Sequence, residues 1–122
     1  MKIVTFKTGG GPIIAEIICG EAQIGSYTLM LWEANVNQIV MEKKGNFINP
    51  DDDSYELPTP NSENNERILD CLCIIAIIPP IKKYYVELKV SQDNQFLGSE
   101  KASGESDSST VAVELFIQLQ AG

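Results

Sequence analysis

The C-terminal stretch 111–120 alternates strictly between large aliphatic residues and a mixed set of other residues. The aliphatic positions are Val111, Val113, Leu115, Ile117 and Leu119, and the intervening positions are Ala112, Glu114, Phe116, Gln118 and Gln120. Because successive side chains of a strand point to opposite faces, this period of two predicts a long strand with one buried face. Phe116 is the large apolar exception on the outward side, and we expect it to cover a neighbouring surface.

The same kind of pattern recurs along the chain, interrupted by turn residues. We predict strands over residues 2–7, 13–19, 26–33, 36–43, 67–78, 84–90 and 111–120, with short strands near 55–57 and 96–97. Residues 91–109, rich in Ser, Gly and Asp, are interpreted as a long hairpin connection. Seven or eight short strands of this kind predict one all-β domain over residues 1–122, a two-sheet antiparallel β-sandwich. Immunoglobulin-like and C2-like topologies are candidates, and the pattern does not distinguish a sandwich from a barrel.

One segment, residues 29–40, fits two periods. A helical stripe is formed by Leu29, Trp32, Val36, Ile39 and Val40. A hairpin is preferred, because the Thr, Asn, Val and Ile residues of this segment are poor helix formers and no capping box precedes them. The turn of that hairpin is expected at residues 33–35.

Residues 67–78 form the most apolar segment, and it ends at the double proline of residues 79–80. Residues 74–78 are apolar on both faces, which favours a central strand covered on both sides or one that passes an interface. Asp70 is the odd polar residue of this strand. We interpret it as structural, either on the outer face or paired with Arg67 or a lysine.

Composition excludes several classes of function. The chain has 9 basic and 17 acidic residues, a formal charge of −8, and Arg67 is its single arginine. This balance argues against binding of nucleic acid or anionic lipid, since both need clustered basic residues. The absence of histidine removes the commonest general base and metal ligand. We therefore predict no enzymatic activity.

The three cysteines, Cys19, Cys71 and Cys73, are predicted to be reduced and buried. Their odd number and apolar surroundings are typical of a cytoplasmic protein. The N-terminus has no signal-peptide pattern, and the longest apolar run is too short to span a bilayer. A cytoplasmic location without membrane insertion is therefore expected.

Acidity is concentrated in two segments. Residues 43–66 carry two positive and six negative side chains, and residues 91–109 carry one positive and four negative ones. Such runs usually serve solubility. The more specific hypothesis is that both segments lie at one end of the domain and attract a cation or a basic partner.

The triple aspartate is the one cluster of hard oxygen ligands. Asp51, Asp52 and Asp53 are candidate calcium ligands, with Asp93 and Asp107 as helpers from a second loop. The register of an EF-hand is absent. We therefore expect no cofactor, with calcium (Ca2+) as the one possible exception.

Three hypotheses of function follow. The first is a non-enzymatic protein-interaction or structural module that binds a protein partner or self-associates, with Trp32 and Phe116 as candidate binding residues. The second is a calcium-dependent module for a carbohydrate or lipid that uses residues 49–56. The third, a glycosidase, needs two converging carboxylates among Glu16, Glu33, Glu87 and Glu114. The triple glycine at 9–11 is interpreted as a turn, because it lacks the Lys and Ser or Thr of a phosphate loop.

Overall fold

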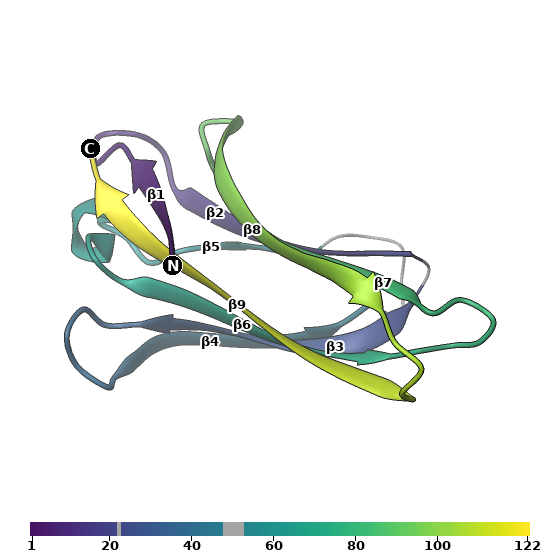
Figure 1. Cartoon of the computed structure of the whole chain (residues 1–122). Helices are drawn as coiled ribbons and strands as arrows, with labels where there is room; N and C mark the ends of the chain where they lie inside the picture. Colours follow the sequence, from purple (N-terminus) through teal and green to yellow (C-terminus); the bar gives the residue numbers. More distant parts are fainter. Residues whose placement is uncertain (22, 48–52) are drawn as a thin grey trace.

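Two β-sheets lie face to face in the computed structural model, which describes residues 1–21, 23–47 and 53–122 (Figure 1). The strands are β1 (Lys2–Phe6), β2 (Ile13–Gly20), β3 (Ile24–Trp32), β4 (Ile39–Asn46), β5 (Asp53–Glu56), β6 (Ile68–Ala76), β7 (Lys83–Gln92), β8 (Gln95–Glu105) and β9 (Thr110–Ala121). A short 3-10 helix, η1 (Asn61–Asn64), precedes β6. The predicted all-β, two-sheet sandwich is confirmed.

The larger sheet has the strand order β1-β9-β6-β3-β4, and the smaller sheet has the order β5-β2-β7-β8. Neighbours are antiparallel except β1, which runs parallel to β9 and places the two termini on adjacent strands (Figure 1). β6 is the central strand of the larger sheet, between β3 and β9. The predicted central position is confirmed, but the strand is not covered on both sides, because Ile74 on its outer face is 41% exposed.

The core lies between the sheets and consists of their inward-facing side chains. β9 contributes Leu115, Ile117 and Leu119, which are the residues that the alternation assigned to the buried face. The other large and fully buried side chains are Val4, Phe6, Ile13, Ile17, Leu29, Leu31, Leu69, Ile75, Val86 and Leu88. Burial of such side chains is worth about 1.5–3 kcal/mol each before the entropy cost of folding.

The hairpin interpretation of residues 29–40 is confirmed, and the helix is excluded. β3 and β4 pair in register from Ser26–Asn46 to Trp32–Ile39. The predicted turn was too short, because β4 begins at Ile39 rather than at Val36. Val36 lies exposed in a turn that the bond from the Glu33 N–H to the Gln38 carbonyl closes.

The prediction for residues 91–109 was wrong. β7 continues to Gln92, a tight turn follows, and β8 then runs for 11 residues instead of forming a loop. Asp93 and Asn94 both have positive φ, 54° and 60°, which is the backbone of a two-residue hairpin turn. Gly98, Ser99, Ser103 and Gly104, which suggested a loop, instead belong to β8 at the edge of the smaller sheet.

The triple glycine forms a turn between β1 and β2, as predicted. Gln92 holds this turn, because its amide group accepts from the Lys7 N–H and donates to the carbonyls of Lys7 and Gly11. The Asn61 amide group also donates to the carbonyls of Gly10 and Gly11. Gly10 and Gly11 therefore serve close packing against the side chains of Gln92 and Asp93, whereas a Cβ at Gly9 would meet nothing within 4 Å.

Candidate binding face on the five-stranded sheet

Apolar side chains line the outer face of the larger sheet, on the side away from the core. The register aligns them in rows across the strands, and the first row consists of Ile39, Trp32, Ile68, Gln118 and Ile3. The next rows contain Met30, Asp70 and Phe116, then Leu72 and Glu114, then Ile74. At about 4.8 Å between strands, a row of five strands is about 19 Å wide.

We call this surface the outer apolar face and define it by Ile3, Met30, Trp32, Ile39, Ile68, Leu72, Ile74 and Phe116. Four of these side chains are strongly exposed: Ile3 by 53%, Ile74 by 41%, Ile39 by 40% and Phe116 by 38%. No described helix or strand lies over this face (Figure 1). Exposed apolar side chains that gather on one side of a sheet are typical of a contact site for another molecule.

Asp70 lies at the centre of this face, although it is only 5% exposed. Its Oδ2 accepts a hydrogen bond of 3.1 Å from the Trp32 Nε1–H. Its Oδ1 is buried without a hydrogen-bond partner among the described residues. The expected pairing with Arg67 is wrong, because Arg67 binds Glu33 instead. The expected position on the outer face is correct.

Glu114 lies diagonally across from Asp70, on β9 opposite Leu72. Hydrogen bonding to Asp70 raises the pKa of the Glu114 carboxyl above its usual value, and burial adds to the shift. A carboxyl group this close to another one is less favourable in its charged form. The outer apolar face thus contains an acid pair near its centre.

The two candidate binding residues, Trp32 and Phe116, both belong to this face. Trp32 is half-buried and shares the outer side with Met30. Phe116 is exposed on the outer side, as the alternation of β9 predicted. The sequence identified Asp70 as unusual but could not place it beside Trp32, because that contact depends on the register between β3 and β6.

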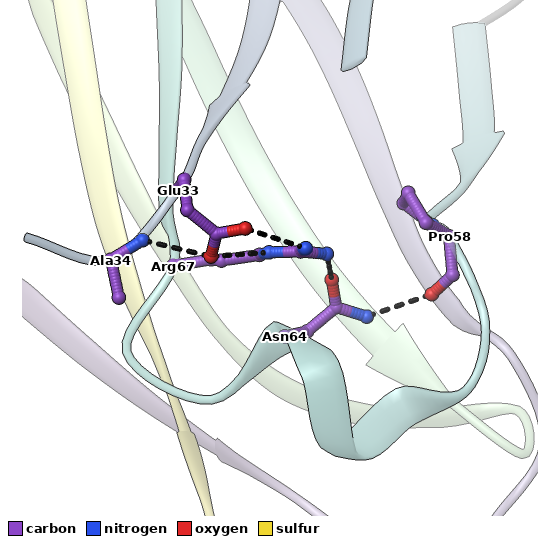
Figure 2. Close-up of polar contacts among 5 residues, drawn as sticks. All are labelled: Glu33, Ala34, Pro58, Asn64 and Arg67. Carbon is purple, nitrogen blue, oxygen red and sulfur yellow. Dashed lines mark hydrogen bonds and ion pairs between the residues drawn. The ribbon is translucent and has the colours of Figure 1, made fainter. Parts of the chain in front are cut away.

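A second polar cluster lies at the end of β3 and is fully paired (Figure 2). The Arg67 guanidinium donates to both carboxylate oxygens of Glu33, at 3.1 and 3.0 Å, and to Oδ1 of Asn64 at 3.0 Å. Asn64 in turn donates to the Pro58 carbonyl at 2.9 Å. The hydrogen bonds from Arg67 lower the pKa of Glu33. Since its groups are satisfied by one another, this cluster fixes η1 and β6 rather than offering a binding site.

The candidate calcium ligands are only partly described. Asp51 and Asp52 lie outside the described residues. Asp53 begins β5 and accepts a hydrogen bond from the Tyr27 hydroxyl, which also contacts the Tyr55 hydroxyl. No group of three metal-ligating side chains occurs in the described ranges. Calcium binding at residues 49–56 stays a prediction.

The helpers expected from a second loop do not lie together. Asp93 is in the turn between β7 and β8, where it accepts from the Gly11 N–H, whereas Asp107 follows β8 and pairs with Lys82. β8 separates them by 11 residues, or about 36 Å at about 3.3 Å per residue. The hypothesis that residues 91–109 form one acidic loop is therefore wrong.

The four glutamates considered for a glycosidase have different partners. Glu16 lies 3.9 Å from the Lys89 ammonium, and Glu87 accepts from the Tyr85 hydroxyl. Glu33 pairs with Arg67, and Glu114 lies beside Asp70. The carboxyl pair that does form involves Asp70, which the sequence did not suggest for this role.

The cysteines are free thiols, as expected. Cys71 and Cys73 are fully buried, with their sulfurs 3.7 Å apart, while Cys19 is half-buried. Burial, and then the proximity of Cys73, raises the pKa of Cys19 to about 11. A thiol with this pKa stays protonated at neutral pH and is a weak nucleophile.

A hollow of about 270 Å³ lies between the glycine turn and η1. Oδ1 of Asn61 is buried there without a partner among the described residues, while its Nδ2 is occupied by backbone carbonyls. Oδ1 of Asn61 is thus a single hydrogen-bond acceptor beside the backbone of the glycine turn. The outer apolar face is the larger feature and combines apolar, aromatic and acidic groups.

No family model, no curated protein and no solved structure matches this chain. Among the described residues, no helix is long and apolar enough to cross a membrane.

Proposed function

We propose that this chain is a non-enzymatic interaction module that binds a partner protein through the outer apolar face. The observation that carries the proposal is the exposure of Ile3, Ile39, Ile74 and Phe116 on one side of one sheet. Interface cores are apolar and rich in aromatic residues, and Trp32 and Phe116 provide that character here. The reduced cysteines support a cytoplasmic setting, which stays a prediction.

The net charge of the chain determines which class of partner protein it attracts. The chain carries a formal charge of −8, so two copies repel each other at neutral pH. A partner with a basic contact surface is instead attracted, and its approach is steered by the opposite charge. The occupant that we propose is therefore a different protein with basic residues in an apolar contact surface, rather than a second copy.

Site-specific photo-crosslinking tests this proposal. Benzoylphenylalanine replaces Phe116 on the outer apolar face in one variant and Phe96 on β8 in the control variant. Both side chains are exposed aromatics, but Phe96 lies on the smaller sheet beneath Lys89. We expect a discrete crosslinked protein, identified by mass spectrometry, from position 116 in native extract and not from position 96.

Competition then links the crosslink to this face. Excess unmodified protein should abolish the product, and an excess of the Ile74→Lys variant should not. A product that forms with purified protein alone would show self-association and contradict the choice of a different partner. Equal products at positions 116 and 96, or none at 116, would overturn the binding face.

A further inference from the structure

Near the centre of the outer apolar face, a buried carboxyl group has an oxygen without a hydrogen-bond partner among the described residues. Asp70 is a carboxylate with one oxygen bound to the Trp32 indole and the other without a partner among the described residues. A buried charge is costly unless a group of opposite charge pairs with it. Arg67, three residues away in sequence, is occupied by Glu33 and Asn64.

We infer that Asp70, together with Glu114, receives an arginine side chain of the partner protein at the centre of the outer apolar face. This inference rests on the proposed function and specifies the partner's chemistry. A guanidinium supplies several donors in one plane, which suits two neighbouring carboxyl groups.

The surroundings favour arginine over lysine. Met30 and Phe116 flank Asp70 on the adjacent strands, and Trp32 donates to it from the next row. Aromatic rings and apolar side chains accommodate the flat, weakly hydrated guanidinium better than a compact ammonium ion. Arginine in an apolar, aromatic environment is also a frequent energetic centre of protein interfaces.

Access to Asp70 requires a side chain to move. Its Oδ1 is covered, and the neighbouring Glu114 carboxyl interacts with it from an exposed position on β9. Glu114 has a flexible side chain at that exposed position, so its carboxyl group can turn toward a guanidinium beside Asp70.

Other charges on this face do not provide the same site. Glu42 and Lys44 on β4 form an exposed ion pair of 3.6 Å, so the anion there already has a cation beside it. Asp70 and Glu114 lie on the central strand and its neighbour β9. We therefore expect the partner's arginine to contact the centre of the outer apolar face rather than its edge.

NMR of the purified, ¹⁵N-labelled protein tests the inference with defined probes. Trp32 is the single tryptophan, so its indole N–H gives one unique resonance that reports directly on the bond to Asp70. The probes are N-benzoyl-arginine amide, its neutral analogue N-benzoyl-citrulline amide, and N-benzoyl-lysine amide. We expect the arginine probe to shift the indole resonance with an affinity roughly tenfold above that of the other two.

Variants assign the effect to the acid pair. Asp70→Asn keeps the shape and an acceptor for the indole, and it should abolish the preference for arginine. Glu114→Gln, at an exposed position, tests the same site if Asp70→Asn is unstable, and it should reduce the preference several-fold. Asp107→Asn, which removes an exposed carboxylate paired with Lys82, is the matched control and should leave the titration unchanged.

The outcomes separate the inference from the proposed function. Equal affinities of the arginine and citrulline probes, or an arginine preference that survives in both acid-pair variants, would overturn the arginine receptor. Equal affinity for lysine would overturn the assignment to arginine. In each case a positive crosslink at position 116 would still support the interaction module.

Discussion

Glu114 shows how one carboxyl group depends on its neighbour. Hydrogen bonding to Asp70 raises the pKa of Glu114, so the folded state favours its protonated form. The resulting stabilisation is fully present below the pKa of the unfolded chain and is lost as the pH rises through the raised folded value. At neutral pH the pair therefore stabilises the fold less than it does in acid.

Replacement of Glu114 by Gln removes this dependence, because the amide group donates to Asp70 at any pH. We expect Glu114→Gln to raise the melting temperature at pH 7 by about 1–3 °C, small because solvent screens this exposed site. The gain should disappear near pH 4. Thermal melts followed by circular dichroism measure it, with Glu105→Gln on β8 as a control of equal charge change. A larger gain at pH 4 than at pH 7 would contradict the raised pKa of Glu114.

Asn64 is a fully buried amide that connects Arg67 to the Pro58 carbonyl. Asn64→Ala leaves a guanidinium N–H and a carbonyl without partners, and we expect a loss of about 2–3 kcal/mol in the free energy of unfolding. Urea denaturation measures it. Asn64→Asp keeps the acceptor for Arg67 and should lose less, whereas exposed Asn37→Ala should change little. Equal stability of the Asn64 and Asn37 variants would show that the cluster of Figure 2 has no structural role.

At the scale of the elements, Gly25 sets the distance between β3 and β6. A Cβ at this position would lie 2.4 Å from the backbone carbonyl oxygen of Ile74. A backbone atom of a central strand cannot move away as easily as the end of a flexible side chain. Gly25→Ala should therefore destabilise the fold by about 1–3 kcal/mol. Gly9→Ala is the matched control, because a Cβ there meets nothing within 4 Å. Urea midpoints that fall equally for both variants would contradict this account.

The elements that were predictable from sequence are those with one clear period. β9 and β7 alternate without interruption, and each has one face in the core. β8 was missed because its polar and small residues resemble a loop, and a two-residue turn of Asp and Asn was not recognised as a hairpin signal. Alternation cannot fix which strands are neighbours, so the order of the larger sheet came only from the structure.

The candidate site was predictable only in part, because alternation does not determine which strands pair. Phe116 stood out by itself as an outward apolar residue. The contact between Asp70 and Trp32 joins residues 38 positions apart and depends on pairing between β3 and β6. A single sequence contains the two residues but not the register that brings them together.

At the scale of the whole molecule, net charge opposes the attraction between outer apolar faces. The charge of −8 at neutral pH keeps copies apart, and it falls to zero near the isoelectric point of about 4.4. Apolar contact should then dominate, since association increases when net charge approaches zero. We therefore expect a monomer at pH 7 and reversible association through the outer apolar face as the pH approaches 4.4.

Two lysine variants separate this face from a general loss of solubility. Phe116→Lys and Phe96→Lys add the same charge to exposed aromatic positions on opposite sheets, so their isoelectric points shift equally. Light scattering from pH 7 to 4.4 should show suppressed association for Phe116→Lys, while Phe96→Lys should behave like the unmodified protein after the common shift. The two variants add the same charge, but only Phe116→Lys interrupts the outer apolar face. An equal effect of both variants would therefore mean that charge alone governs association.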